Sequence, residues 1–150
     1  MTMKKIIVIN GPNLNLLGNR EKNFYGETTL QKIQSSCEEH CKRINLECFF
    51  FQSNHEGELI EKIQSANNEY NGIIINPAAF THTSIALLDA LRATNLPKIE
   101  IHISNIYARE DYRRKSITSQ AVNGLICGFG ENGYILAIDA IKNLIYSDKA

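Results

Sequence analysis

The sequence predicts an α/β fold built on a doubly wound parallel sheet of five strands in the order 2-1-3-4-5. Short apolar runs alternate with helix-length amphipathic segments along the chain, which is typical of βαβ units. Two of the runs, 6–9 and 73–75, are apolar throughout, as expected for strands that helices cover on both faces. The length of 150 residues suits one core, so 1–150 is assigned to a single domain.

Each element follows from a local pattern. Strands are expected at 6–10, 46–52, 72–76, 98–103 and 124–128, and helices at 28–43, 56–70, 83–94 and 133–146. Thr28 or Thr29 suits the N-cap of the first helix, and Pro97 follows the end of the third. The second helix has one apolar face, formed by Leu59, Ile60, Ile63 and Ala66. Five strands and four helices in this order fit a flavodoxin-like sheet.

Composition argues against several classes of partner. The chain has 16 Lys and Arg against 16 Asp and Glu, so nothing in its charge favours nucleic acid or an anionic membrane. The apolar run after Lys4 and Lys5 ends at Asn10 and is too short for a signal peptide. No run approaches the roughly 20 apolar residues of a membrane span. A cytoplasmic location is the resulting expectation.

The four cysteines are expected to be reduced thiols without a metal. They are Cys37, Cys41, Cys48 and Cys127. The sequence has no C-x-x-C pair, and zinc sites usually need paired short spacings. Cys37 and Cys41 lie one helical turn apart with His40 between them, which is only a weak indication of a metal site.

The fold class itself indicates where a ligand would bind. In open α/β sheets the site lies beyond the carboxyl ends of the strands, where the strand order reverses, so the segments after strands 1, 3 and 4 are the candidates. The first is long and polar, and Gly18 and Gly26 bracket Arg20 and Tyr25. This pattern fits an active-site lid or, equally, a surface loop with a packed Tyr. It lacks the glycine-rich phosphate motifs, so nucleotide binding has little support.

The segment after strand 3, from Asn76 to Ser84, is rich in small and hydrogen-bonding side chains. A helix N-terminus here would suit a carboxylate or hydroxyl ligand. His82 is a candidate contact, or simply a residue at the start of the helix. Asp89 follows two turns later beside the apolar Ile85 and Leu88, which indicates an interface, a site or an exposed carboxylate.

Strand 4 carries a polar pair that requires an explanation. Alternation places Glu100 and His102 on one face, although a central parallel strand is expected to be apolar on both faces. A carboxylate can hold one imidazole nitrogen and leave the other for proton transfer; a purely structural pair is the alternative. Arginines follow the strand, and they suit a bound anion or a solvated basic face. The residues concerned are Tyr107, Arg109, Tyr112, Arg113 and Arg114.

Taken together, these segments resemble type II 3-dehydroquinate dehydratases over nearly the whole chain. The matching motifs are N-G-P-N-L-N-x-L-G at Asn10–Gly18, R-E-x-x-x-Y-G at Arg20–Gly26, N-P-x-A-x-T-H-T-S at Asn76–Ser84, E-I-H-I-S-N at Glu100–Asn105 and A-R-E-x-x-R at Ala108–Arg113. Each motif alone is modest. Their order and spacing together are specific.

The resemblance implies a catalytic role for five residues. Tyr25 would be the general base that removes a proton from C2 of 3-dehydroquinate, and His102 the general acid that protonates the departing C1 hydroxyl. Asn13 would stabilise the enol(ate), Arg20 would stabilise negative charge in the transition state, and Glu100 would orient His102. The reaction would need no cofactor, metal or Schiff base, and it would belong to the shikimate pathway of aromatic amino acid biosynthesis.

Further residues would bind the substrate. Asn76, His82, Ile103, Ser104 and Arg113 would hold its hydroxyls and carboxylate, and Arg109 would join Arg20 in favouring the phenolate of Tyr25. Asp89 would reach the site from a neighbouring subunit of a homo-oligomer, a dodecamer built as a tetramer of trimers. Two positions depart from the family pattern: Ala78 replaces a frequent Gly, and the lid spacer 22–24 lacks a frequent Pro.

Two other functional classes remain as alternatives. A receiver or flavin carrier could share the fold, but a receiver needs an acidic cluster after strand 1, and Asn10–Asn13 contains none. A flavin carrier would be yellow. A metal-dependent hydrolase could use His82, Asp89 and His102, and a chelator would abolish its activity.

Tyr25→Phe tests the assignment of the base. The substitution keeps the ring and removes the phenol, so we expect it to abolish turnover of 3-dehydroquinate and to leave folding intact. The measurement is the ultraviolet absorbance of the conjugated enone product. A rate near that of the wild type would remove Tyr25 as the base.

Overall fold

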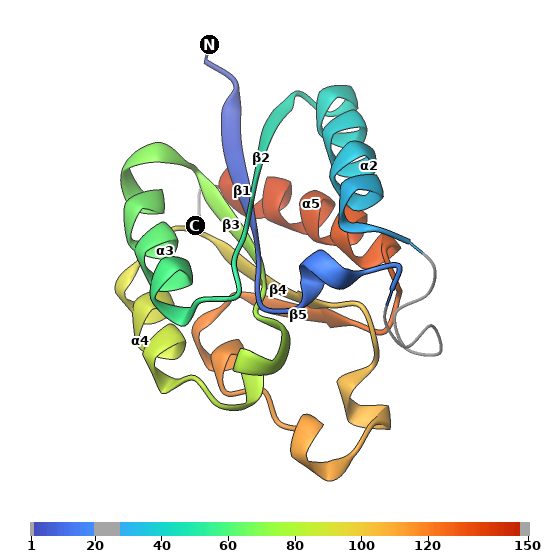
Figure 1. Ribbon diagram of the computed structural model, residues 1–150. Helices are drawn as coiled ribbons and strands as arrows, with labels where there is room; N and C mark the ends of the chain where they lie inside the picture. The colour runs from blue at the N-terminus through green and yellow to red at the C-terminus, as the bar shows by residue number, and fades with distance from the viewer. Residues whose placement is uncertain (1, 20–27, 148–150) are drawn as a thin grey trace.

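The fold is a parallel five-stranded sheet between two layers of helices (Figure 1). It comes from a computed structural model that describes residues 2–19 and 28–147. The strand order is β2-β1-β3-β4-β5, and each neighbouring pair is parallel. The predicted α/β sheet and its order 2-1-3-4-5 are therefore confirmed.

The observed elements agree with the predicted ones to within a few residues at most ends. The strands are β1 Lys4–Asn10, β2 Leu46–Gln52, β3 Gly72–Asn76, β4 Lys98–His102 and β5 Gly124–Cys127. The main helices are α2 Leu30–Arg43, α3 Glu56–Glu69, α4 Ile85–Ala93 and α5 Asn132–Ile145. Thr29 is the N-cap of α2, and its side chain accepts a hydrogen bond from the Lys32 N–H.

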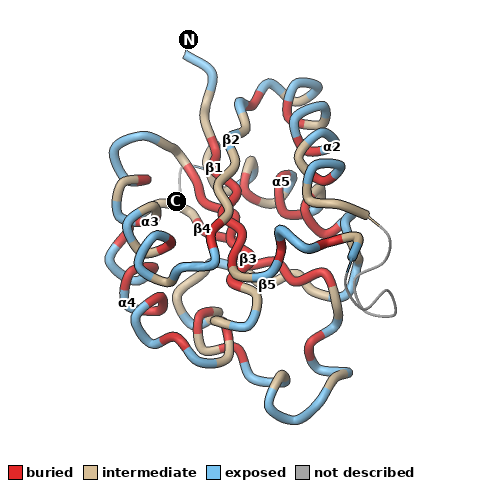
Figure 2. The backbone as a smooth tube through the Cα atoms, viewed as in Figure 1, coloured by how far each residue is buried: buried red, intermediate tan, exposed pale blue. Residues whose placement is uncertain are grey.

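Each face of the sheet packs against its own pair of helices. Ile6, Val8 and Ile74 point into the core shared with α2 and α5, while the alternating Ile7 and Ile73 face α3 and α4. The buried track along β1, β3 and β4 runs through the centre of the molecule (Figure 2). Burial on both faces is the reason that the central strands are apolar at almost every position.

The segment after β3 differs from its prediction. The expected helix at 83–94 begins only at Ile85, and a 3-10 turn, η2 Ala78–His82, precedes it. The Ser84 side chain accepts from the Leu87 N–H and so caps α4 itself. His82 therefore belongs to a turn, and the first residues of α4 are not among the described residues that line the pocket beyond β1, β3 and β4. Short 3-10 turns also follow β1 and β4, at η1 Leu14–Leu16, η3 Ile106–Ala108, η4 Asp111–Arg113 and η5 Thr118–Ala121.

The ends of β1 and β3 approach each other closely at Gly11. Its N–H donates to the Asn76 carbonyl at 2.8 Å. A Cβ on Gly11 would lie 2.6 Å from the Pro77 carbonyl oxygen, which is closer than van der Waals contact allows. The glycine is thus required by the approach of two backbones.

The described residues contain neither a disulfide nor a helix suited to span a membrane. The four cysteines are free thiols. Cys37 and Cys41, on α2, are buried in the core that α2 shares with α5 and the sheet. Within residues 2–19 and 28–147, no three His, Cys, Asp or Glu side chains are grouped as metal ligands. Over the same residues, no helix has the length and apolar character needed to cross a bilayer.

Gly11→Ala should destabilise the fold by about 1–3 kcal/mol, because the added methyl forces the two strand ends apart. Urea denaturation measures the change. Gly57→Ala is the control: that exposed glycine lies in α3 with open space around its Cα, so alanine should stabilise by about 0.5–1 kcal/mol. Equal behaviour of the two variants would contradict the proposed close approach.

Candidate active site

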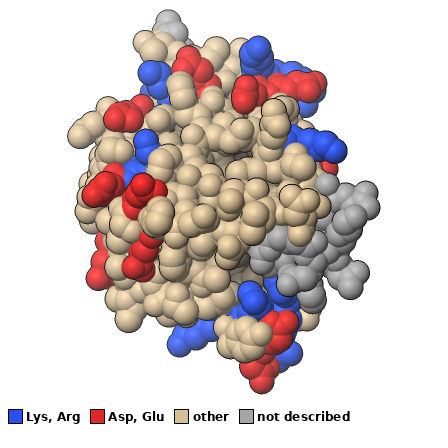
Figure 3. Space-filling view, viewed as in Figure 1, with Lys and Arg blue, Asp and Glu red and all other residues tan. Residues whose placement is uncertain are grey.

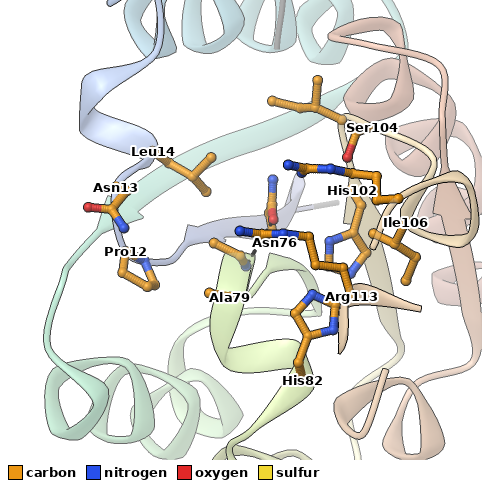
Figure 4. Close-up of a pocket in the computed structure, with 13 residues that line it drawn as sticks. Pro12, Asn13, Leu14, Asn76, Ala79, His82, His102, Ser104, Ile106 and Arg113 are labelled. Carbon is orange, nitrogen blue, oxygen red and sulfur yellow. Dashed lines mark hydrogen bonds between the residues drawn. The ribbon is translucent and has the colours of Figure 1, made fainter. Parts of the chain in front are cut away.

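A pocket opens beyond the carboxyl ends of β1, β3 and β4, at the position where the strand order reverses. Pro12, Asn13 and Leu14 lie on one side of it, and His82, His102 and Arg113 lie on the other (Figure 4). The predicted site residues that line it are Asn13, Asn76, His82, His102, Ile103, Ser104, Arg109 and Arg113. The pocket therefore lies after strands 1, 3 and 4, where the sequence predicts a ligand site.

The turn after β1 places Asn13 at the pocket. Asn13 has a positive φ of 69°, a conformation that Asn tolerates better than most residues. Its N–H donates to Asn54 Oδ1 at 2.9 Å, and Gln52 Nε2 donates to the same oxygen and to the Gly11 carbonyl. Sequence reasoning missed Gln52 and Asn54, because only the pairing of β1 with β2 brings them beside this turn.

A buried tyrosine fixes the ends of β1 and β3. The Tyr134 hydroxyl, on α5, donates to Asn10 Oδ1 at 2.6 Å and accepts from Asn76 Nδ2 at 3.0 Å. Asn76 Oδ1 also accepts from the Ala78 N–H. Burial raises the pKa of Tyr134. The phenol therefore stays protonated and can donate its hydrogen bond to Asn10. Asn76 thus reaches the pocket with its orientation already set, a constraint that sequence reasoning did not detect.

Glu100 and His102 form a buried pair at the end of β4. His102 Nε2 lies 2.6 Å from Glu100 Oε2, and the side chains are 6% and 0% exposed. Because Nε2 faces the carboxylate, Nδ1 is the imidazole nitrogen left for a ligand. The pairing that strand alternation predicted is present, and His102 lines the pocket.

Three hydroxyls surround the same carboxylate. Thr81 and Ser116 donate to Glu100 Oε2, and Thr118 donates to Oε1. Burial alone would raise the pKa of Glu100, but the hydrogen bond and charge of His102, with the hydroxyls of Thr118 and Ser116, outweigh it and lower the pKa. Glu100 is therefore a carboxylate at neutral pH.

His82 occupies the lower wall of the pocket on η2. Its Nδ1 lies 2.8 Å from the Lys115 carbonyl, which accepts when Nδ1 carries the proton. Burial lowers the pKa of His82, and the nearby His102 and Arg113 lower it further, against the opposing effect of the Lys115 carbonyl. A neutral His82 presents Nε2 to a ligand.

Arg109 and Arg113 supply the positive charge of the pocket. Arg113 Nε donates to Glu110 Oε2 at 2.7 Å, which holds the side chain on η4. Arg114 instead pairs with Asp111 and does not line the pocket. At the bottom of Figure 3, Lys and Arg side chains lie beside acidic side chains. The segment from η3 to η4 lies at the bottom of Figure 1, which has the same view. Of the three arginines in this segment, Arg109 and Arg113 line the pocket and Arg114 does not.

Comparison with known proteins agrees with this geometry. Residues 4–142 match the family model described as dehydroquinase class II. The chain is 53% identical over 147 residues to a 3-dehydroquinate dehydratase of Clostridium botulinum (strain Okra / Type B1), covering 98% of this chain and 100% of that one.

The chain belongs to the class II dehydroquinase family. Solved structures agree: the type II dehydroquinase of Butyrivibrio crossotus is 49% identical with a TM-score of 0.92, over 93% of this chain and 98% of that one. The type II dehydroquinase of Propionibacterium acnes is 40% identical with a TM-score of 0.89, over 96% and 97% of the two chains. The predicted resemblance is confirmed, and the family's named enzymes are hydro-lyases.

Four predicted residues are not among the described residues that line the pocket. Glu100 is fully buried and is joined to the pocket by His102. Arg20 and Tyr25 fall in 20–27, outside the described residues. Asp89 is exposed on α4 and is not among the described residues that line the pocket. A hydrolytic metal site made of His82, His102 and Asp89 therefore has no geometric support within one chain.

Ala78 has a backbone conformation that favours glycine. Its φ is 54°, in the left-handed region that costs an L-residue roughly 1–2 kcal/mol. The residue follows Pro77 at the start of η2 and lines the pocket. The departure noted in the sequence thus affects backbone strain as well as the space for a ligand.

Ala78→Gly should therefore stabilise the protein by about 0.5–1 kcal/mol. This is the backbone strain that glycine relieves minus the extra conformational entropy that a glycine loses on folding. Chemical denaturation gives the free energy of unfolding. Ala79→Gly is the matched control, since Ala79 is exposed on η2 and is not among the described non-glycine residues with positive φ; it should lose stability. A loss in both variants would show that Ala78 carries no relievable strain.

Proposed function

We propose that the chain is a type II 3-dehydroquinate dehydratase, which converts 3-dehydroquinate to 3-dehydroshikimate and water by anti elimination. The observation that carries the proposal is the buried Glu100–His102 pair, open to a pocket with two arginines, in a chain of this family. The proposed biological setting is the shikimate pathway of aromatic amino acid synthesis.

The first step is loss of a proton from C2, next to the ketone. Tyr25 is the proposed base. A free tyrosine has a pKa of about 10, so the pKa of a tyrosine base must be lowered. We assign this effect to the guanidinium groups of Arg20 and Arg109, which would stabilise the phenolate of Tyr25. Arg109 lines the pocket, which supports this part of the proposal.

The resulting enol(ate) needs donors that are already in place. Asn13 is the proposed stabilising residue, through its side chain and a water molecule, and the Asn54 contact to its backbone holds it at the pocket. Arg20 is proposed to stabilise the negative charge of the transition state. A route without a Schiff base is part of the proposal.

The second step expels the C1 hydroxyl as water. A hydroxyl leaves poorly unless it is protonated, and His102 is the proposed acid. Its proton would come from Nδ1, because Nε2 is held by Glu100. The anionic Glu100 also stabilises the positive imidazolium before transfer.

The remaining residues of the pocket are proposed to bind the substrate. Arg113 suits its carboxylate, since a guanidinium can donate two parallel hydrogen bonds. Asn76 and His82 are assigned to hydroxyls, while Ile103 and Ser104 act through backbone N–H groups and the Ser104 hydroxyl. All five line the pocket.

Assembly is part of the proposal. Asp89 is exposed on α4 and is not among the described residues that line the pocket, so the proposal assigns it to the site of another subunit. We propose a homo-oligomer in which Asp89 completes a neighbouring site, with a dodecamer built as a tetramer of trimers as the expected form.

The activity itself is tested with metal-free protein and 3-dehydroquinate, by following absorbance of the enone product with and without borohydride. We expect equal signals in both samples. A signal lost with borohydride would indicate an imine and overturn the mechanism. No signal from the folded protein would overturn the proposed function.

His102→Ala should lower kcat by roughly 100-fold or more, the usual contribution of a general acid, with little change in the fold. His40→Ala is the matched control, because His40 also pairs with a carboxylate, Asp139 at 2.7 Å, but on the α2 and α5 side of the sheet. Substantial activity in His102→Ala would exclude His102 as the acid.

A further inference from the structure

The feature that the proposed chemistry leaves unexplained is the set of hydroxyls around Glu100. Thr118 Oγ1 lies 2.6 Å from Glu100 Oε1, and the hydroxyls of Thr81 and Ser116 each lie 2.8 Å from Oε2. Thr81 and Thr118 are 0% exposed and Ser116 is 9% exposed. We call these three side chains the hydroxyl collar.

The collar is assembled from two segments that are far apart in the sequence. Thr81 lies on η2, and Ser116 and Thr118 lie at the start of η5. The Ile117 N–H donates to the Thr81 carbonyl at 2.6 Å, and the Thr81 hydroxyl lies 2.7 Å from those of both Ser116 and Thr118. The collar therefore joins the segment after β3 to the segment after the arginines.

Hydrogen-bond accounting shows what the collar can donate. Ser116 Oγ accepts the Ser119 N–H, and its own proton can go to Glu100 Oε2 at 2.8 Å or to the Thr81 hydroxyl at 2.7 Å. Thr118 has Glu100 Oε1 as its carboxylate partner. Bonds to a charged acceptor are roughly twice as strong as neutral ones. The arrangement with hydroxyl protons directed to an anionic Glu100 is therefore favoured over one in which Glu100 carries the proton.

The surroundings of Glu100 are otherwise apolar on the sheet. Its strand neighbours are Ile75 on β3 and Leu125 on β5. The ionisable side chains of α4, Asp89 and Arg92, are exposed. On the same face of β4, Lys98 donates its ammonium protons to the Thr94 and Leu96 carbonyls.

Within the described residues, the ionisable side chains near the Glu100 carboxylate on the pocket side are those of His102, His82, Arg109 and Arg113. His102 is the one that contacts Glu100 directly. The collar closes the remaining sides of the carboxylate with neutral donors, which supply hydrogen bonds without adding a titrating charge.

We propose that Thr81, Ser116 and Thr118 are positioning residues for the acid His102, because they hold Glu100 ionised and fix its two oxygens. A carboxylate that already accepts several hydrogen bonds is a weak base, so it orients Nε2–H without removing the proton from the imidazolium. The transferable proton then stays on Nδ1, the imidazole nitrogen that does not bond Glu100. This inference rests on the proposed function for its catalytic consequence, but not for the ionisation of Glu100.

Thr118→Val removes one hydroxyl and nearly preserves shape. Carbon-13 NMR of the glutamate side-chain carboxyls, with Glu100→Gln to assign the signal, follows the ionisation of Glu100 directly. We expect its titration midpoint to rise in Thr118→Val. We also expect the acid limb of the kcat profile to move up by about one pH unit, the effect of losing one hydrogen bond to a charge, with KM changed less than threefold.

Two further variants separate positioning from simple structural support. Thr118→Ser restores the hydroxyl and should restore both profiles. Thr94→Val removes a buried hydroxyl at the other end of the sheet, where Thr94 bonds Asn67, so it should lower stability and leave both profiles unchanged. If Thr118→Val does not fold, Ser116→Ala tests the same carboxylate from Oε2.

An unchanged Glu100 titration in a folded Thr118→Val or Ser116→Ala protein would overturn the proposal, as would an equal shift in Thr94→Val. The NMR result does not depend on turnover. Failure of the wild-type protein to dehydrate 3-dehydroquinate would therefore reject the proposed function alone, while the Glu100 signal would still decide whether the collar holds the carboxylate ionised.

Discussion

A carboxylate buried in the middle of a parallel sheet is the constraint on which the site depends. Glu100 is 0% exposed on β4, where a lone charge would be costly. The structure offsets that cost by directing one imidazole and three hydroxyls at its two oxygens. These donors come from β4, η2 and η5, so satisfying one charge fixes the relative positions of three segments that bound the pocket.

A second buried hydrogen-bond network fixes the segments on the other side of the pocket. Tyr134 reaches from α5 to Asn10 and Asn76, at the ends of β1 and β3. Gly11 permits the two backbones to meet. The wall that carries Asn13 is thereby fixed to the core, while the wall with Arg109 and Arg113 stands on short 3-10 turns.

The two walls therefore differ in how they are supported. One is anchored by a fully buried phenol whose proton is retained because burial raises its pKa. On the other side, His102 and η2 are joined to Glu100, which the surrounding donors keep ionised. The proposed proton transfer from His102 would take place between these two supports, from an imidazole that Glu100 holds in a fixed orientation.

The sequence by itself determined the sheet order, most element boundaries to within a few residues, and the family, because apolar periodicity and motif spacing are local properties of the chain. It also placed Glu100 and His102 on one face of a strand. It did not determine that Thr81, Ser116 and Thr118 converge on Glu100, or that Tyr134 joins Asn10 to Asn76. Those contacts span from 16 to 124 positions, and only tertiary packing decides which distant side chains satisfy a buried polar group.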